Sequence, residues 1–532
     1  MAISNRVILL YLLLVGVLLV QCSRSVSVKH SVKEKPQKYK ILFRNGRPMG
    51  GLVGHWKEDF SKGQSEMDNI NDDIFGNPNL NISWMTQKLD HFSGSDPRTF
   101  QQRYWVNTAF YKPGGPAFIM LGGEGPTSRH WIDINEGTPD WLKNAKTFGA
   151  MAFQLEHRFY GKTWPTPDMS TPNLMYLSSR QALADTASFI TAMKKKYPML
   201  ARAKWVTFGG SYSGALSGWF RLKYPHMVVG AVATSAPVLA QLDYRQYFGV
   251  IGASLWGYSP MCYQAVHNAD LRVQQLMKTP AGMQMLNQKF RLCNDISKAN
   301  KWDIMNFYTN VAGNFAGVVQ YTQDNRGVYA STLTLPIVCQ IMMNPSMPDP
   351  IDRYARVNKL IMDTYGATCT SYRYMDMINV LRQTNFATAP QASFRLWVWQ
   401  TCTEFAYFQN SNSTQQPFSN QFPLSFSIKM CQDLFGQNFN QNYISRMVKS
   451  TNVYYGARNF KGSKVIFPNG SVDPWHALGI LNTMGPTLPA TFILGTAHCA
   501  NMYPPRSIDL MTLNAARSQI TKALRSWLNN SM

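Results

Sequence analysis

Short apolar runs bounded by glycine or polar residues recur in the first half of the chain. They lie at residues 116–121, 150–155, 204–208 and 228–234. Each run is too short for a stable helix and is typical of a buried strand. After the second run, Leu183, Ala187 and Ile190 recur at helical spacing within residues 179–194. Strands that alternate with helices predict an α/β protein with a parallel sheet.

The pattern changes after about residue 240. Residues 241–448 contain no comparable β-rich runs, and helix-like segments rich in methionine and aromatic residues take their place. Strand-like runs return at 465–467 and 491–494, followed by a helix near 507–528. We therefore expect an α/β domain built from residues 81–240 and 449–532 and interrupted by a largely helical insertion.

The first residues have the pattern of a secretory signal. Arg6 precedes an uncharged run at residues 7–20, and small or polar residues follow. The run is shorter than the ~20 apolar residues that a membrane span needs. A signal peptide over residues 1–22 is therefore favoured over a membrane anchor. We expect a secreted or lysosomal protein that has no stable membrane insertion after this peptide is removed.

Positive charge dominates the composition, and the net charge is +23. It is densest at residues 23–50, where eight basic residues accompany one acid, Glu34. Residues 23–80 are predicted to be a basic flexible or pro-peptide-like segment. A nucleic-acid partner is not expected, because the protein is predicted to be exported and no recognition module follows.

Eight cysteines are present, and Cys22 falls within the predicted signal peptide. The other seven form no C-x-x-C pair, which disfavours a structural zinc site, so no metal is expected. Six of them lie between residues 262 and 431. Disulfides clustered in that region are the better prediction for an oxidising compartment. Acceptor motifs for N-glycosylation begin at Asn81, Asn412, Asn469 and Asn529.

The strongest local signal for chemistry is the sequence GGSYSG at residues 209–214. It follows a predicted strand and precedes a helix-compatible stretch at 215–224. A serine on a sharp strand–turn–helix is a nucleophile elbow, and such a turn needs small neighbours. Ser211 is the predicted nucleophile, although Ser213 stands where the G-x-S-x-G pattern has its last glycine. A glycine- and serine-rich loop without a catalytic role is the alternative.

A serine hydroxyl needs a general base and an acid that orients the base. Asp473 and His498 each follow one of the last two predicted strands after a short turn. The α/β-hydrolase fold places its acid and base at such strand ends, and the order Ser211, Asp473, His498 is the order of that fold. Taken singly, Asp473 could be a turn residue and His498 a packed side chain. His157 is the reserve candidate for the base.

Acyl transfer also needs donors for a developing oxyanion. The backbone N–H of Tyr212 is one candidate, and the loop that contains Gly122 and Gly123 supplies the other. A phosphate-binding role for this loop is weaker, because the P-loop pattern is absent and Glu124 would repel phosphate. Chemistry of this kind needs no cofactor.

Several stretches together resemble one peptidase family, which comprises lysosomal Pro-X carboxypeptidase, dipeptidyl peptidase II and the thymus-specific serine peptidase. They are QKLDHF at 87–92, FIMLGGEGP at 118–126, EHRFYG at 156–161, QALADTASF at 181–189, GGSYSG at 209–214, KYPH at 223–226, SAPV at 235–238, CTEF at 402–405 and DPW at 473–475. They run in unbroken order from about residue 84 onward. CTEF and the pair His498-Cys499 are most similar to the thymus-specific branch.

The resemblance implies a serine peptidase of the α/β-hydrolase fold with the triad named above. It also implies a helical cap that narrows the cleft, so an exopeptidase acting on short peptides is expected. The family's cap disulfides map onto Cys262–Cys339 and Cys293–Cys369. Cys402–Cys431 is then the third predicted pair, and Cys499 is left unpaired.

Substrate preference is less constrained by the resemblance. The proline-cleaving members carry Met where this chain has Ala215, which puts a preference for proline in doubt. Trp475 matches the family and can form an apolar wall of the pocket. Glu156 and Glu404 could bind a free substrate amine, and structural ion pairs are the alternative for both.

Two functions of other kinds compete with a peptidase. One is a secreted esterase or lipase on the same fold, and the other is a non-catalytic binding protein on a hydrolase scaffold. The complete set of Ser211, Asp473 and His498 favours an enzyme. Peptide substrates are the expected partners, and a homodimer is one expected assembly.

Overall fold

The structure is a computed structural model that describes residues 77–134, 138–323, 332–389 and 392–529 of the 532-residue chain. It also describes the backbone of two short antiparallel strands, β1 (Phe43–Arg44) and β2 (Arg47–Pro48). The predicted signal peptide at 1–22 and most of the predicted basic segment at 23–80 lie outside the described residues.

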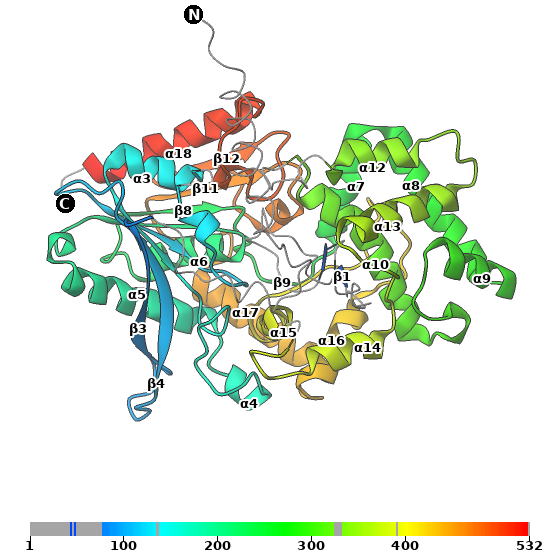
Figure 1. The fold of residues 1–532 in the computed structure, drawn as a ribbon, viewed down its shortest axis with the longest axis horizontal. Helices are drawn as coiled ribbons and strands as arrows, with labels where there is room; N and C mark the ends of the chain where they lie inside the picture. Colours follow the sequence, from blue (N-terminus) through cyan, green and yellow to red (C-terminus); the bar gives the residue numbers. More distant parts are fainter. Residues whose placement is uncertain are drawn as a thin grey trace, which may run out of the picture. The chain divides into compact units, whose positions relative to one another are not determined.

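An eight-stranded sheet forms the framework of the parts of the chain before and after the insertion (Figure 1). Its strand order is β12-β11-β8-β7-β5-β6-β4-β3. The strands are β3 (Leu80–Lys88), β4 (Thr99–Asn107), β5 (Ala117–Leu121), β6 (Met151–Leu155), β7 (Trp205–Gly210), β8 (Gly230–Thr234), β11 (Val465–Gly470) and β12 (Ala490–Ile493). β4 is antiparallel to both its neighbours, and the strands from β6 to β12 are parallel. The predicted parallel sheet is confirmed.

Each face of the sheet is covered by helices, because the central strands are apolar on both sides. In β5, Ile119 and Leu121 pack into one core with residues of α5 and α6. Phe118 and Met120 point the other way, into a core with residues of α3 and α18. These helices are α3 (Asp140–Phe148), α5 (Ser179–Lys196), α6 (Tyr212–Lys223) and α18 (Met511–Asn529). Helices on both faces of a mainly parallel sheet, with an elbow after β7, form the α/β-hydrolase fold.

Between β8 and β11 the chain is mainly helical, as the sequence predicts (green and yellow in Figure 1). The helices are α7 (Gln246–Tyr258), α8 (Pro260–Leu276), α9 (Pro280–Lys289), α10 (Lys301–Gln320), α12 (Leu335–Met342), α13 (Pro350–Thr364), α14 (Tyr374–Leu381), α15 (Ala392–Gln400), α16 (Leu424–Phe435) and α17 (Gln441–Tyr455). Two short parallel strands, β9 (Gln241–Asp243) and β10 (Ala406–Phe408), pair within it. We call this region the cap; α17 is continuous across the boundary expected at residue 448.

Three disulfides connect elements of the cap, and all three predicted pairs are confirmed. They are Cys262–Cys339, Cys293–Cys369 and Cys402–Cys431. The first joins α8 to α12, and the third joins a π-helical turn, η4 (Thr401–Phe405), to α16. Cys499 is a free, buried thiol. Each disulfide therefore connects two parts of the cap.

One predicted glycosylation acceptor is enclosed by the fold. Asn81, Asn412 and Asn529 are exposed, whereas Asn469 lies within β11 and is 1% exposed. Its Nδ2 donates to the carbonyl oxygen of Ile480 at 2.9 Å. An amide held in this way cannot carry a glycan in the folded protein, so the prediction for Asn469 is wrong.

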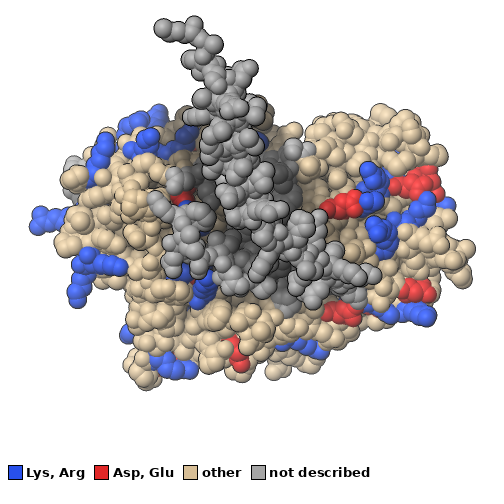
Figure 2. Space-filling model, viewed as in Figure 1, with Lys and Arg blue, Asp and Glu red and all other residues tan. Residues whose placement is uncertain are grey.

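The basic residues on the face shown in Figure 2 are not gathered into one patch. Lysines and arginines are dispersed over the face shown in Figure 2 and alternate with neutral surface. In the described part of the chain, no helix combines the length and the apolar character that crossing a bilayer requires.

Candidate active site

Ser211 occupies a strained turn between β7 and α6. β7 ends at Gly210 and α6 begins at Tyr212, so one residue makes the whole connection. Its backbone angles are φ 62° and ψ −132°, a region that side-chain-bearing residues rarely adopt. The Ser211 N–H donates to the carbonyl oxygen of Thr234 in β8 at 3.0 Å. The geometry is that of a nucleophile elbow, which lifts a serine hydroxyl out of the sheet edge.

The residues around the elbow are small because the backbone passes close by. A Cβ on Gly209 would lie 2.0 Å from the carbonyl oxygen of Ser213, and a Cβ on Gly214 would lie 2.4 Å from that of Thr234. Ser213 is tolerated where the pattern has glycine. Its hydroxyl donates to the carbonyl oxygen of Gly210 at 2.8 Å, which closes the turn.

Asp473 and His498 come together at the ends of β11 and β12. Nδ1 of His498 lies 2.8 Å from Oδ1 of Asp473, and both side chains are fully enclosed. Oδ1 also accepts the N–H of Trp475 at 2.9 Å, which caps the 3₁₀ helix η5 (Pro474–Leu478). The backbone N–H of His498 donates to the carbonyl oxygen of Gln320, the last residue of α10, at 2.9 Å. The cap thus helps to fix the histidine loop.

The electrostatics of this pair make the imidazole of His498 more basic. Burial by itself lowers the pKa of His498, but the negative charge of Asp473 and contact with Cys499 outweigh it and hold the pKa well above the usual value. Among the described residues, neither ring nitrogen of His498 has a partner with full hydrogen-bond geometry, but Nδ1 lies at ion-pair distance from Asp473 and Nε2 does not. Nε2 is therefore free to exchange a proton with a substrate or a nearby hydroxyl.

The histidine loop lies against the elbow. A Cβ on Gly210 would lie 2.9 Å from Sγ of Cys499, the residue after His498. The N–H of Cys499 donates to Oγ of Ser235 at 3.0 Å, directly after β8. Catalytic hydrogen bonds are often long before substrate binds, so the missing bond to Nε2 is compatible with a triad.

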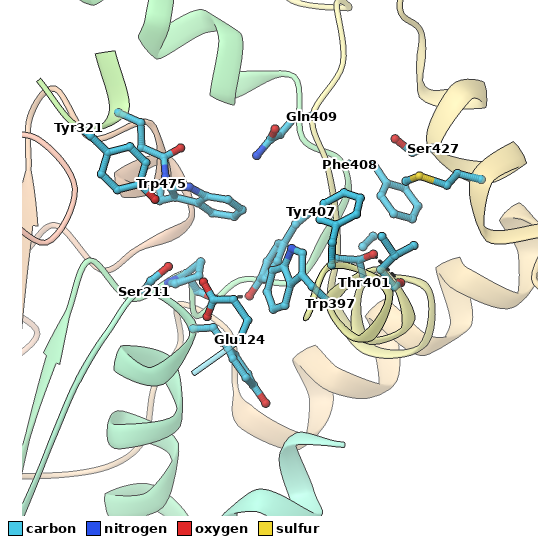
Figure 3. A pocket seen from close by; sticks show the side chains of 17 residues that line it. Glu124, Ser211, Tyr321, Trp397, Thr401, Tyr407, Phe408, Gln409, Ser427 and Trp475 are labelled. Atoms are coloured by element: carbon cyan, nitrogen blue, oxygen red, sulfur yellow. Dashed lines mark hydrogen bonds between the residues drawn. The ribbon is translucent and has the colours of Figure 1, made fainter. Parts of the chain in front are cut away.

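A pocket opens at Ser211 and extends into the cap (Figure 3). Its described lining residues are Glu124, Ser211, Tyr212, Pro237, Gln320, Tyr321, Phe394, Trp397, Val398, Thr401, Ala406, Tyr407, Phe408, Gln409, Ser427, Met430 and Trp475. Five of these 17 residues are aromatic side chains of the cap: Tyr321, Phe394, Trp397, Tyr407 and Phe408. Trp475 lies in it, as the sequence predicts, whereas Ala215 is buried in the core and does not line it.

Of the predicted oxyanion donors, Tyr212 and Gly123 remain candidates. Tyr212 is the first residue of α6, so its N–H has no intrahelical partner. Gly123 lies beside the elbow, since a Cβ there would be 3.5 Å from Cβ of Ser213. The N–H of Gly122 instead donates to the carbonyl oxygen of Leu155 at 2.8 Å. Its predicted role as a donor is therefore wrong, because that N–H extends the sheet.

The two glutamates predicted to bind a substrate amine are already paired inside the protein. Glu156 forms a buried ion pair with Arg103 at 2.7 Å and accepts the hydroxyl of Thr163 at 2.8 Å. Glu404 accepts the N–H and the hydroxyl of Ser179, at 3.0 and 2.6 Å. Neither lines the pocket. The structural ion pair is confirmed for Glu156, whereas Glu404 is held by neutral donors, and the predicted contact of both with substrate is wrong.

His157, the reserve base, also belongs to a structural network. Its Nδ1 lies 2.8 Å from the carbonyl oxygen of Arg158 and its Nε2 3.0 Å from the hydroxyl of Tyr212. Gln400 donates to the same hydroxyl at 2.9 Å. Burial lowers the pKa of His157 to about 4, so the ring is neutral. The network holds the Tyr212 side chain from below the elbow.

Glu124 is the pocket residue that sequence reasoning missed. It was considered only as an obstacle to phosphate, yet its side chain lines the pocket together with Ser211 (Figure 3). The sequence does carry a signal for this residue: Glu124 is an acid among the glycines of a loop that follows a buried strand. Among the described residues, no cluster of acidic, histidine or cysteine side chains is arranged to hold a metal ion.

Comparison with known proteins agrees with this geometry. The model of the family "Serine carboxypeptidase S28" matches residues 87–520. The chain belongs to this family. A Caenorhabditis elegans protein that carries the name of a serine protease is 40% identical over 526 residues, which cover 97% of this chain and 99% of the relative. The S28 membership makes the protein a serine peptidase.

Two further relatives test which branch of the S28 family is more similar. The thymus-specific serine protease of Mus musculus is 34% identical, covering 84% of this chain and 87% of the relative. The lysosomal Pro-X carboxypeptidase of Homo sapiens is 28% identical, covering 85% and 89%. The greater likeness to the thymus-specific protein is the one the motifs predict. Among solved structures, proline iminopeptidase of Mycobacterium smegmatis matches 84% of this chain and 98% of its own at 12% identity, and its TM-score of 0.34 is too low to add to the topology described above.

Proposed function

We propose that Ser211, Asp473 and His498 form the catalytic triad of this serine peptidase. The observation that carries the proposal is the strained serine in the pocket lining, whose neighbour Gly210 lies against the loop that carries the buried Asp–His pair. These three residues come from the ends of β7, β11 and β12, which are far apart in sequence. A backbone in a costly conformation at a pocket supports a catalytic role.

In the proposed reaction, His498 takes the proton of the Ser211 hydroxyl as Oγ attacks a peptide carbonyl carbon. The protonated ring is stabilised by Asp473, which holds Nδ1. The oxyanion is bound by the N–H groups of Tyr212 and Gly123. His498 then gives its proton to the leaving amine, and an acyl-enzyme ester remains on Ser211. Water attacks this ester with the same histidine as base, which releases the acid product and restores the serine.

We further propose an exopeptidase that works in the secretory pathway or the lysosome. Cap residues such as Trp397, Tyr407 and Phe408 line the pocket, and their bulk supports the entry of a chain end rather than a folded loop. Three disulfides suit an oxidising compartment. The relatives named lysosomal Pro-X carboxypeptidase support the lysosome as a destination.

Labelling with a fluorophosphonate tests the proposed nucleophile. We expect covalent modification of Ser211, found by mass spectrometry of the digested protein. Ser211→Ala should abolish labelling and lower kcat on peptides by ~10⁶-fold. Ser213→Ala is the matched control, because it removes the other serine hydroxyl of the elbow and keeps the proposed nucleophile, so labelling at Ser211 should remain. Peptide hydrolysis that survives in Ser211→Ala would refute the proposed triad.

A further inference from the structure

Glu124 places a carboxyl group with one unpaired oxygen, Oε2, in the described wall of the pocket. The residue follows Gly123 in the loop after β5 and is only 5% exposed. Its Oε2 has no hydrogen-bond partner among the described residues. Figure 3 shows its carboxyl group next to Ser211, on the side toward Trp397 and Tyr407.

Such a group is costly unless a ligand compensates it. A buried carboxylate loses its hydration, and at Glu124 the oxygen Oε2 has no hydrogen bond among the described residues to offset that loss. Burial raises the pKa of Glu124 to about 7, although attraction to His498 opposes the shift. A positively charged ligand group would offset this cost more than a neutral one.

The charged residues in the pocket wall also determine which sign of ligand charge is favoured. No lysine or arginine is among its described lining residues. A substrate carboxylate would therefore find no cation in the described wall and would meet Glu124. The rings of Trp397, Tyr407 and Trp475 favour cations over anions. The pocket thus suits an ammonium group.

We propose that Glu124 binds the free α-ammonium group of the peptide substrate, so that the enzyme removes one or two residues from amino ends. This inference rests on the proposed function of Ser211, because it places the scissile carbonyl at that residue. Glu124 is a specificity-determining residue and takes no part in proton transfer. Glu156 and Glu404 cannot serve in its place, since their oxygens are occupied by Arg103 and Ser179.

The direct test uses one peptide sequence in three forms: with free ends, N-acetylated, and C-amidated. Loss of a charged hydrogen bond predicts that acetylation lowers kcat/KM by about 10- to 100-fold. Amidation should change kcat/KM little. Glu124→Gln should lower kcat/KM for the free-amine peptide by the same factor and leave the acetylated peptide unaffected. Glu124→Asp, which keeps the charge, should restore part of the preference.

The pH dependence of KM separates this role from a merely structural one. For the free-amine peptide, 1/KM should rise as Glu124 ionises with a pKa of about 7 and fall as the substrate amine loses its proton near pH 8. In Glu124→Gln the rise should vanish. Asp140→Asn is the matched control, since Asp140 is another buried acid with a pKa raised to about 6, but it lies on α3 outside the pocket. It should keep the wild-type preference.

The outcomes distinguish this inference from the proposed function. If amidation lowers kcat/KM and acetylation does not, the pocket binds carboxyl ends and the inference is overturned. It is equally overturned if neither modification matters. If Ser211 is not labelled by the fluorophosphonate, the proposed triad fails by itself. Calorimetric binding of a free and an acetylated dipeptide amide to Ser211→Ala then still tests Glu124, and equal affinities would contradict the inference.

Discussion

Asp473 controls the protonation of His498, and its removal has a defined pH signature. In Asp473→Asn the charge that raises the pKa of His498 is lost while burial, which lowers it, remains. The acidic limb of the kcat/KM profile should therefore move to lower pH. The rate at its optimum should fall by about 10⁴-fold, because the ring loses its preferred tautomer. Steady-state kinetics on a small ester between pH 4 and pH 9 measure both effects, and an unmoved acidic limb would count against His498 as the base.

Asn469 gives a second test at the scale of single residues. Its amide is enclosed in β11, whereas Asn81, Asn412 and Asn529 face solvent. Glycopeptide mass spectrometry of the folded, active protein should find glycans only among the three exposed sites. A glycan at Asn469 in active enzyme would show that this end of β11 is not packed as described.

At the scale of elements, the disulfide between η4 and α16 is expected to hold the pocket wall. Cys402–Cys431 closes a segment with a sequence separation of 29, for which loop-closure entropy predicts about 3–4 kcal/mol of stabilisation. The neighbouring residues Thr401 and Met430 line the pocket. The double variant Cys402→Ser/Cys431→Ser should therefore lower Tm and raise KM more than it lowers kcat. Thermal unfolding and kinetics check this, and an unchanged KM would mean that the wall does not depend on the crosslink.

Local sequence predicts the central strands, and there are physical reasons why it does not predict the others. β5, β6, β7 and β8 are short apolar runs because both their faces are covered, so each run stands out. β3 and β4 were not predicted, since an antiparallel pair at the sheet edge mixes polar and apolar positions, as in the partly exposed pattern of Leu80–Lys88. The elbow was predictable because only glycine or serine fits its turn.

Side-chain pairing in the site could not be predicted in the same way. Glu156, Glu404 and Glu124 are all acids beside motif residues, and the sequence does not say which has a partner. Arg103 reaches Glu156 across 53 positions, and Ser179 reaches Glu404 across 225. Only the folded chain shows that Glu124 is the one left with an unpaired oxygen among the described residues.

At the scale of the whole molecule, the cap and the sheet are joined at the loops that carry the proposed triad. The cap residue Gln320 accepts the N–H of His498 through its carbonyl oxygen and the hydroxyl of Tyr247 through Oε1. Tyr244, just before α7, donates to the carbonyl oxygen of Pro474 at 2.6 Å, next to Asp473. The cap therefore positions the proposed acid and base as well as lining the pocket.

Tyr244→Phe tests this coupling with a single atom. It leaves the buried carbonyl oxygen of Pro474 without its partner, which should cost about 1–3 kcal/mol of unfolding free energy. Because that carbonyl adjoins Asp473, kcat should fall while KM changes little. Tyr354→Phe is the matched control, since the Tyr354 hydroxyl is buried in the cap without a partner among the described residues and its loss should not destabilise the protein. Denaturant unfolding and kinetics measure both variants. If Tyr244→Phe lowers stability but leaves kcat unchanged, the cap covers the site without positioning it.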